Sequence, residues 1–212
     1  MTQQGVLIVL SGPSGAGKGT ICQRLLRSYP ALHYSVSATT RTPRKGEING
    51  KNYWFIDKEQ FQLMIENDDL LEWAEVYGNF YGTPRRYVQE QLNSGKDVVL
   101  EIDIQGAMQI KTKFPQGIFI YIIPPSLDEL AQRIYKRGTD SMESIKRRLS
   151  CAGHELAAAR RYHYLVINDD VSVAVNKVEA ILTAEKCKVE RNLNLLEQVC
   201  QSDCVERGEL ND

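Results

Sequence analysis

A glycine-rich run that leads into a lysine is the first stretch of the chain whose residue types are suited to chemistry. The run is GPSGAGKGT, and its residues are Gly12, Pro13, Ser14, Gly15, Ala16, Gly17, Lys18, Gly19 and Thr20. It fits the pattern GxxxxGK, in which backbone N–H groups converge on phosphate oxygens and the lysine reaches the terminal phosphates. We therefore expect a nucleoside triphosphate site; the alternative is a glycine-rich turn without a ligand.

The run departs from the full pattern at one position. Gly19 stands where a serine or threonine usually ligates a metal ion, and the hydroxyl follows one residue later, at Thr20. A side chain at position 19 therefore cannot be a metal ligand. The pattern still predicts triphosphate binding, but it does not say what is done with the nucleotide.

A second group of phosphate-binding residue types lies in the segment 35–44, SVSATTRTPR, where several hydroxyls accompany Arg41 and Arg44. Arginine suits phosphate because its planar guanidinium can donate two parallel hydrogen bonds. Two phosphate sites in one chain suggest transfer between two nucleotides. The alternative is a solvated loop with ordinary surface arginines.

Short apolar runs separated by amphipathic stretches must position these two groups. The apolar runs predict four buried strands, at Val6–Leu10, Val98–Ile104, Ile118–Ile123 and Leu165–Ile167. The amphipathic stretches predict helices at Thr20–Arg27, Gln105–Thr112, Leu127–Lys136 and Met142–Arg160. Buried strands that alternate with helices predict an α/β fold in which helices cover both faces of a parallel sheet.

The segment from Val36 to Tyr87 interrupts this alternation. It holds nine of the chain's 17 aromatic residues. Its turn residues give hairpin-like spacing at Gly46–Tyr53 and Val76–Tyr81. We expect a mixed, β-rich insertion with a small core of its own.

The composition argues against several other classes of protein. The chain has 212 residues and a net charge of −1, whereas a bulk nucleic-acid binder is usually strongly basic. No apolar stretch approaches the roughly 18 residues that span a membrane, and the N-terminus lacks the basic start of a secretory signal. Five scattered cysteines without a CxxC pair favour reduced thiols and a cytoplasmic location over disulfides or structural zinc.

Taken together, the motifs resemble those of guanylate kinases. GPSGAGKGT, SVSATTRTPRKGEINGKNYWF, LLEWAEVYGNFYGTP, EIDIQG, PPS, RG followed by SIKRRL, and NDD occur in that family's order and spacing over about residues 5–186. The resemblance implies the P-loop kinase fold, with a parallel five-stranded core sheet flanked by helices, a mixed β-rich insertion and a helical lid. It also implies transfer of the γ-phosphoryl group of ATP to GMP, with dGMP as an expected second acceptor and Mg²⁺ as cofactor.

The resemblance further implies a division of the chain. The core ATP-binding domain would comprise 1–36, 88–126 and 160–186. The GMP-binding domain would be 37–87, and the lid 127–159, with Gly138 as an expected hinge. The segment 187–212 would be an extension beyond the family domain.

Site roles follow from the same resemblance, residue by residue. The groups that read guanine would be Ser37 and Glu72. The clamp on the GMP phosphate would be formed by Arg41, Arg44, Tyr53 and Tyr81. Thr83 keeps a hydroxyl where many members have serine.

The remaining roles concern the donor nucleotide and the metal. Asp103 resembles the acidic group near the metal and the acceptor, whereas Glu101 stands where an aspartate is common. Asn168 resembles a residue near the adenine. The side chains expected to carry charge in the transfer step are Lys18, Arg41, Arg133, Arg137 and Arg148.

The expected reaction needs positive charge and no general base. A phosphate monoester is largely dianionic at neutral pH because its second pKa is about 6. The nucleophile is therefore already deprotonated, and His33, His154 and His163 are expected to be surface or packing residues. Positioning, Mg²⁺, Lys18 and the arginines would bring two anions together.

Guanine selection has its own chemical requirement. A carboxylate at Glu72 can accept from the N1–H and N2–H₂ donors of guanine, and Ser37 can donate to O6. Adenine would leave that carboxylate facing a lone pair, which a buried site discriminates against strongly.

Two other functions remain open at this point. One is a catalytically inactive scaffold that binds phosphopeptides through the GMP site. Such scaffolds typically lack the phosphate loop, which is present here. The other is a P-loop kinase for a different phosphorylated acceptor, and the pair of Ser37 and Glu72 is the feature that distinguishes it.

The resemblance ends near Lys186, within a stretch of helical apolar spacing. Val171, Val175, Val178 and Leu182 follow helical spacing and are expected to pack on the core. Apolar spacing resumes at Val189, Leu193, Leu196 and Cys200, so the same helix could continue. One alternative is a frayed helix with a disordered acidic end. The other is an amphipathic helix that joins two subunits in a homo-oligomer or docks on its own core.

Overall fold

The strand β1 (Leu7–Ser11) is buried along its whole length and forms the centre of a five-stranded parallel sheet. The structure, a computed structural model, describes residues 5–136 and 142–206. In the order β2-β7-β1-β8-β9, the other strands are Leu32–Tyr34, Asp97–Glu101, Ile118–Ile123 and Tyr164–Ile167. The four strands predicted from apolar runs are confirmed. The pattern missed β2, which has three residues, of which only Leu32 is fully buried.

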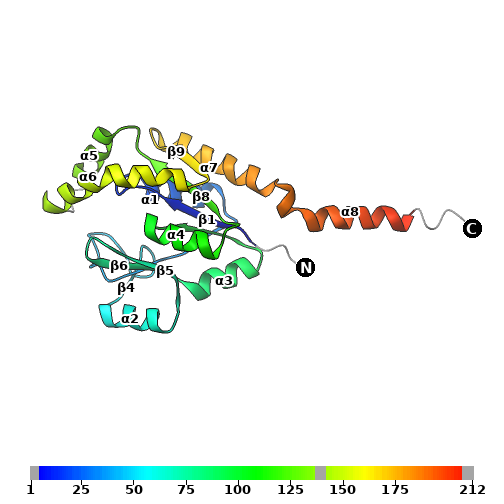
Figure 1. The fold of residues 1–212 in the computed structure, drawn as a ribbon, viewed down its shortest axis with the longest axis horizontal. Coiled ribbons are helices and arrows are strands. Elements are labelled where there is room, and N and C mark those ends of the chain that lie inside the picture. Colours follow the sequence, from blue (N-terminus) through cyan, green and yellow to red (C-terminus); the bar gives the residue numbers. More distant parts are fainter. Residues whose placement is uncertain (1–4, 137–141, 207–212) are drawn as a thin grey trace, which may run out of the picture.

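Alternate side chains of β1 enter two different cores. Ile8 and Leu10 pack with α1 (Lys18–Ser28) and α7 (Val171–Lys186) on one face of the sheet. Leu7 and Val9 pack on the other face with helices α3 and α4, which span Arg85–Asn93 and Ile104–Lys113. Figure 1 shows the sheet enclosed between these helices. Helices on both faces explain why the strands are almost continuously apolar.

The expected β-rich insertion is a separate four-stranded sheet of order β4-β3-β6-β5. Helix α2 (Lys58–Glu66) covers it through Phe61, whose ring stacks on Phe80 with centroids 5.5 Å apart. A capping box at Asp57 and Gln60 fixes the start of α2. The strands are Ala38–Thr39, Trp54–Phe55, Leu70–Val76 and Asn79–Pro84.

Of the two predicted hairpins, one is correct and one is wrong. Strands β5 and β6 pair as an antiparallel hairpin that ends at Val76 and Asn79. The segment 46–53 is instead a looped connection, because β3 and β4 pair in parallel and a parallel pair cannot be joined by a tight turn.

Two predicted boundaries also shift. The strand expected to reach Ile104 ends at Glu101, because the carboxylate of Asp103 accepts from the N–H groups of Gln105 and Gly106 and so starts α4. The helix expected to reach Arg160 ends at Ala157, followed by a 3₁₀ turn, Ala158–Arg161.

The helices α5 (Leu127–Lys136) and α6 (Met142–Ala157) pack against each other above the carboxyl end of the sheet (Figure 1). They share a small core of Leu130, Ile134, Ile145 and Ala152. The connection between them contains Arg137 and Gly138, so these two predicted residues lie outside the described part of the chain.

The apolar spacing had suggested that one helix could continue to the C-terminal segment, but the structure has two separate helices there. Helix α7 ends at Lys186, a short turn contains the 3₁₀ helix Val189–Arg191, and α8 begins at Leu193 and runs to Glu206. The predicted packing of α7 through Val175, Val178 and Leu182 is confirmed. In Figure 1, α8 projects away from the rest of the molecule. No helix in the described ranges is long and apolar enough to cross a membrane.

Candidate active site

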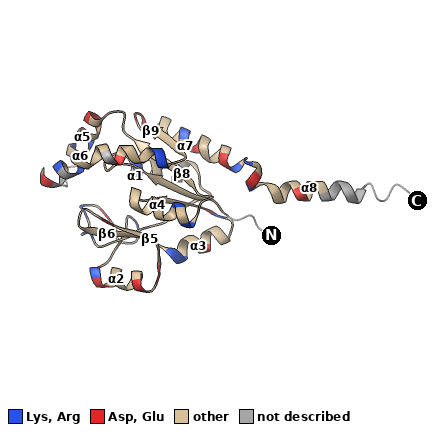
Figure 2. Cartoon of the chain, viewed as in Figure 1, with Lys and Arg blue, Asp and Glu red and all other residues tan. Residues whose placement is uncertain are grey.

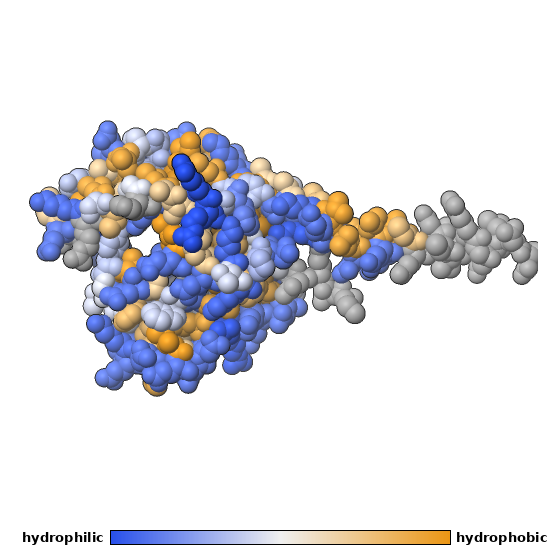
Figure 3. All heavy atoms as spheres, in the orientation of Figure 1, coloured by the Kyte–Doolittle hydropathy of each residue, from blue (hydrophilic) through white to orange (hydrophobic). Residues whose placement is uncertain are grey.

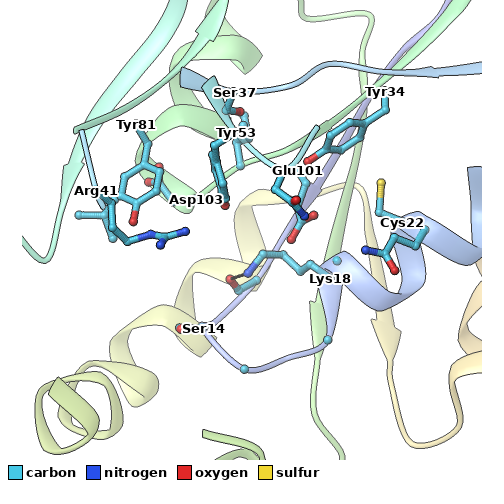
Figure 4. Close-up of a pocket in the computed structure, with 18 of the residues that line it drawn as sticks. Ser14, Lys18, Cys22, Tyr34, Ser37, Arg41, Tyr53, Tyr81, Glu101 and Asp103 are labelled. Atoms are coloured by element: carbon cyan, nitrogen blue, oxygen red, sulfur yellow. Dashed lines mark hydrogen bonds between the residues drawn. The ribbon is translucent and has the colours of Figure 1, made fainter. Parts of the chain in front are cut away.

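A cavity of about 720 Å³ lies between the carboxyl end of the large sheet and the inner side of the small one. The loop after β1 and the residues after β7 form one wall, and side chains of the small sheet and its loops form the other. Figure 3 shows the hollow as an opening between two lobes. In Figure 4, Lys18 lies opposite Arg41, Tyr53 and Tyr81, with Glu101 between Lys18 and Tyr34. The two predicted phosphate-binding groups therefore face one space.

The loop after β1 has the backbone conformation that a phosphate-binding loop needs. Gly17 has a φ of 90°, and a Cβ there would lie 2.3 Å from the side-chain nitrogen of Asn168. Only glycine fits such a position. Helix α1 starts at Lys18, whose Nζ donates to the carbonyl oxygens of Gly12 at 2.7 Å and Pro13 at 3.2 Å. The loop thus ends in a helix N-terminus with an ammonium group beside it.

Not every residue of the predicted loop faces the cavity. Pro13 and Ala16 are buried beneath it, and the side chain of Thr20 is exposed on α1. The loop residues that line the cavity are Gly12, Ser14, Gly15, Gly17, Lys18 and Gly19.

Asn168 lies under the phosphate loop. Its side chain is 2% exposed, and Nδ2 donates to the carbonyl oxygen of Ala16 at 2.7 Å. Its own carbonyl oxygen accepts from Nη2 of Arg133 at 2.9 Å. These contacts are those of a residue that supports the loop from behind, and its place near the adenine stays a prediction.

Two of the three predicted lid arginines lie close to the loop. Arg133 forms an ion pair with Glu129, one turn earlier in α5, with Nε and Oε1 2.8 Å apart. Arg148, on α6, lines the cavity and donates from Nη1 to the hydroxyl of Ser14. The third, Arg137, lies outside the described residues.

On the opposite wall, an acidic residue holds the first of the two predicted phosphate-binding arginines. Nη2 of Arg41 lies 2.9 Å and 3.0 Å from the two carboxylate oxygens of Glu47. Burial would raise the pKa of Glu47, but hydrogen bonds from Arg41 and from the backbone of Arg44 lower it below its ordinary value. Glu47 therefore stays ionised and fixes the guanidinium of Arg41 over the ring of Tyr53, 5.4 Å from its centroid.

Tyr53 and Tyr81 complete this wall. Their rings meet edge to face with centroids 5.9 Å apart. Arg44 is half-buried in the loop after β3, and all of these side chains line the cavity. Two arginines and two tyrosines thus line one cavity, and these residue types suit a phosphate clamp.

Glu72 lies deeper, on β5, and is 2% exposed. Its Oε1 accepts from the hydroxyl of Thr83 at 2.6 Å. A Cβ at Gly106, the second residue after the start of α4, would lie 2.1 Å from Oε2, so only glycine leaves room for this carboxylate. Burial raises the pKa of Glu72 to about 8. Ser37, 5% exposed, lines the same cavity.

Two acidic side chains lie at the carboxyl end of β7, Glu101 as its last residue and Asp103 two residues later. Asp103 caps α4 and faces the cavity, and burial raises its pKa although Lys18 acts in the opposite direction. Glu101 faces Gly19, since a Cβ at position 19 would be 3.4 Å from both of its carboxylate oxygens. The position that departs from the loop pattern thus lies directly against a carboxylate.

Sequence reasoning missed several residues of this site. The available signal for Glu47 was an acidic residue six positions after Arg41, in a turn with glycine at position 46. Tyr77 and Glu155 also line the cavity and are hydrogen-bonded to each other. They are 78 positions apart, and no local pattern pairs such residues.

A phosphate loop at the carboxyl edge of a parallel sheet, facing a second set of phosphate-binding side chains across one cavity, defines a phosphotransferase of the P-loop kinase class. Comparison with known proteins gives the particular family. The family model described as Guanylate kinase matches residues 4–185. The chain belongs to the guanylate kinase family.

Individual relatives agree with this assignment. A guanylate kinase of Desulfitobacterium hafniense is 59% identical over 187 residues, which cover 88% of this chain and 94% of the relative. A guanylate kinase of Halalkalibacterium halodurans is 51% identical over 199 residues, covering 94% and 98%. The crystal structure of guanylate kinase from Anaplasma phagocytophilum superposes with a TM-score of 0.76 at 35% identity, covering 89% of this chain and 90% of that one.

Proposed function

We propose that the protein transfers the γ-phosphoryl group of ATP to GMP and releases ADP and GDP. The observation that carries the proposal is the single cavity that presents Lys18 and the phosphate loop on one wall and Arg41, Tyr53 and Glu72 on the other. One wall fits a triphosphate, and the other fits a monophosphate attached to a base with hydrogen-bond donors. The curated relatives, which are named guanylate kinases at 51–59% identity, support the same reaction.

The chemical step requires little beyond positioning and charge. The acceptor phosphate of GMP is largely dianionic at neutral pH, so it attacks without a base. Arg41, Arg44 and the two tyrosines hold that phosphate, while Lys18, Arg133 and Arg148 balance the charge that develops on the transferring group. Fixed cations close to the reacting oxygens lower the repulsion between the two anionic substrates.

Selection of guanine is assigned to Glu72 and Ser37. Thr83 donates to one oxygen of Glu72 and so fixes the orientation of the carboxylate. An ionised, buried carboxylate in this orientation can accept from both N1–H and N2–H₂ of guanine, and the Ser37 hydroxyl can donate to O6. Adenine lacks these donors, and the resulting unpaired buried group would cost about 1–3 kcal/mol. Nothing in this pairing involves the ribose, so dGMP is also expected to be an acceptor.

The site also fits Mg²⁺, which the family's reaction generally uses. Glu101 and Asp103 supply hard oxygen atoms beside Lys18. Within residues 5–136 and 142–206, no group of three or more histidine, cysteine or acidic side chains forms a metal cage. The metal would therefore be held mainly by nucleotide phosphates and water, with Asp103 and Glu101 as the nearest protein groups. When bound, it would neutralise charge on the phosphate oxygens.

We assign three parts of the chain to this reaction. The segment 37–87, which carries the small sheet, binds GMP. The segment 127–159, which contains α5 and α6, is the lid that excludes water, and 1–36, 88–126 and 160–186 form the ATP-binding core. The assignment is supported by the distribution of the cavity's walls among these segments.

An acceptor panel tests the function directly. ADP release is followed with ATP and, in turn, GMP, dGMP, AMP, UMP and CMP. We expect turnover with GMP and dGMP that exceeds turnover with the other three by at least about a hundredfold, since a buried polar mismatch discriminates by this much or more. Equal turnover with AMP would assign the site to another acceptor. No turnover with any of the five would favour the phosphopeptide-binding scaffold.

A further inference from the structure

The tip of the β5–β6 hairpin carries an unusual residue. Tyr77 has a φ of +52° and is followed by Gly78 with a φ of +81°. Two such residues form the tight turn that suits a two-residue hairpin, where asparagine and glycine are preferred. A tyrosine in the left-handed region is strained, and such residues persist where other contacts hold them. Here the contacts lie across the cavity.

The first contact is with helix α6. The hydroxyl of Tyr77 donates to Oε1 of Glu155 at 3.2 Å. Burial and then the nearby Glu155 raise the pKa of Tyr77 above its ordinary value, so the phenol remains a donor. The backbone carbonyl of Glu155 accepts from the hydroxyl of Tyr121, which is fully buried in β8. The acceptor for Tyr77 is therefore anchored to the core sheet.

The second contact is with a charged side chain of the same helix. The guanidinium carbon of Arg148 lies 5.1 Å from the centroid of the Tyr77 ring. Arg148 is two helical turns from Glu155, so both side chains leave the same face of α6. Arg148 also donates to the hydroxyl of Ser14 in the phosphate loop. One guanidinium thus connects the donor loop, the α6 helix and the hairpin of the small sheet.

We propose that Tyr77 is a positioning residue that sets the guanidinium of Arg148 over the donor phosphates when the hairpin is in place. The proposal rests on the proposed function, because it needs Arg148 to act on the transferring group. The ring offers a flat surface that restricts the arginine, as cation–π contacts do. The bond to Glu155 fixes the ring. Because the hairpin belongs to the GMP-binding segment, ordering of that segment by GMP would complete the donor side of the site.

Four single variants separate the parts of this arrangement. Tyr77→Phe removes the hydroxyl and keeps the ring. Tyr77→Asn removes the ring and suits the left-handed backbone. Glu155→Ala removes the acceptor, and Glu155→Gln restores an acceptor oxygen. The control is Tyr87→Phe, the same loss of a hydroxyl from an exposed tyrosine on α3.

We expect kcat to fall about threefold to tenfold in Tyr77→Phe and Glu155→Ala, the usual effect of one hydrogen bond. Glu155→Gln should recover most of the loss, and Tyr77→Asn should lose at least about tenfold. The KM for GMP and the melting temperature should stay close to those of the unmodified protein, and Tyr87→Phe should be unaltered. A raised KM with normal kcat would show that Tyr77 merely binds GMP, and unaltered kinetics in Tyr77→Asn would refute the proposal.

A double-variant comparison tests the route of the effect. In an Arg148→Ala background, measured by single-turnover phosphoryl transfer, Tyr77→Asn should cause no further loss. If the ring acted only by stabilising the hairpin, Tyr77→Asn would cause the same loss of rate in the Arg148→Ala background as in the unmodified protein. That result would overturn the proposal. The unmodified protein is assayed beside these variants with GMP. If the unmodified protein is inactive, the proposed function itself is wrong. If it is active and the Tyr77 variants have the same kinetics, only the role of Tyr77 is wrong.

Discussion

At the level of single residues, the site depends on charged side chains whose positions are fixed by neighbouring residues. Arg41 is held by Glu47, and Glu72 is oriented by Thr83 and by the space at Gly106. Glu47 had no predicted role, whereas Thr83 was itself predicted as a site residue. The functional side chains follow from motifs, whereas their orientation follows from tertiary contacts.

Lys18 is the residue whose removal should have the largest effect. Its ammonium group carries charge in the transfer step, so Lys18→Ala should lower kcat by about a hundredfold to a thousandfold, as other preorganised donors do. The fold should remain, as circular dichroism would show. A matched control is Lys58→Ala, an exposed lysine of α2. Near-normal turnover in a folded Lys18→Ala protein would contradict the role of the phosphate loop.

Glu72 should make GMP binding depend on pH. Its pKa is about 8 in the free protein because it is buried, whereas guanine donates to the ionised form and so favours loss of the proton. GMP affinity should therefore rise as pH increases from about 6.8 to 8 and level off above that value. Isothermal titration across this range measures the change, together with the proton released on binding.

The control for this pH effect is Glu72→Gln. It should bind GMP more weakly by roughly 1–3 kcal/mol, the cost of an imperfectly paired buried group, and should lose the pH dependence around 8. ATP affinity should barely change. An unaltered pH profile in Glu72→Gln would place the titrating group elsewhere, and equal losses for both nucleotides would make Glu72 a structural residue.

At the scale of elements, the central sheet and most helices could be predicted from apolar periodicity. Strands such as Ile118–Ile123 and helices such as Leu127–Lys136 match the pattern because packing and propensity agree there. The strand Leu32–Tyr34 was missed because three residues give no period. The loop before Tyr53 was mistaken for a hairpin, because turn residues do not show whether the flanking strands pair in parallel.

The site residues could be predicted only where a motif carries them. Lys18 and Arg41 stand in long, specific motifs, but the position of Asn168 beneath Ala16 depends on a contact 152 residues apart in sequence. Glu155 likewise reaches Tyr77 only after α6 has packed above the sheet. Distances of this kind are set by the fold as a whole.

Asn168 allows a test of the loop as an element. Asn168→Ala would leave the Ala16 carbonyl without its donor, so we expect a loss of about 1–3 kcal/mol in unfolding free energy. The KM for ATP should rise severalfold, with little change for GMP. Asn168→Asp, which keeps the size but replaces the donor with an acceptor, should be at least as damaging. A changed preference between ATP and GTP with normal stability would instead support the predicted place of Asn168 near the adenine.

At the scale of the whole molecule, the C-terminal extension has two parts. Glu185 is almost fully buried and forms ion pairs with Lys188 and Arg191, and Arg191 also donates to the carbonyl of Gln116. The turn after α7 is therefore attached to the core. Helix α8 is different, since its apolar residues Leu193, Leu195, Leu196 and Val199 are about half exposed. Figure 3 shows an orange band along the projecting helix, and Figure 2 shows little of the colour of charged residues on its described part.

This exposure bears on the alternatives for the extension. The described part of α8 does not dock on its own core, which removes one of them. The relative from Halalkalibacterium halodurans aligns over 199 residues, so at least 13 aligned residues lie after Lys186. Joining of two subunits through α8 remains a prediction. Light scattering tests this prediction. Only subunit joining through α8 predicts that the full chain is an oligomer and that a chain ending at Asn192 is a monomer.

Two truncations should separate the attached turn from α8. A chain ending at Asn192 should keep both phosphotransfer and stability. A chain ending at Lys186 should keep phosphotransfer but lose about 1–3 kcal/mol in unfolding free energy, because Glu185 loses the cations that stabilise its buried carboxylate. Loss of activity in the chain that ends at Asn192 would place part of the active site in α8.

The second truncation also has a pH signature. Burial would raise the pKa of Glu185, but hydrogen bonds from Lys188, Tyr164 and Arg191 hold it below its ordinary value. A carboxyl group with a lowered pKa contributes stability above its unfolded pKa and loses it as pH falls. The difference in stability between the two truncated chains should therefore be full near pH 7 and shrink below about pH 4.5. Urea unfolding at several pH values measures it.

The fate of a labelled γ-phosphoryl group shows whether it passes directly between two nucleotides that occupy one cavity. The protein is mixed with Mg²⁺, GMP and ATP that carries ³²P in the γ position, and the products are separated over time. We predict that the label appears in the β position of GDP, in equal amount to the ADP formed, with little inorganic phosphate. Label that is released mainly as inorganic phosphate, or that stays bound to the protein, would contradict the account.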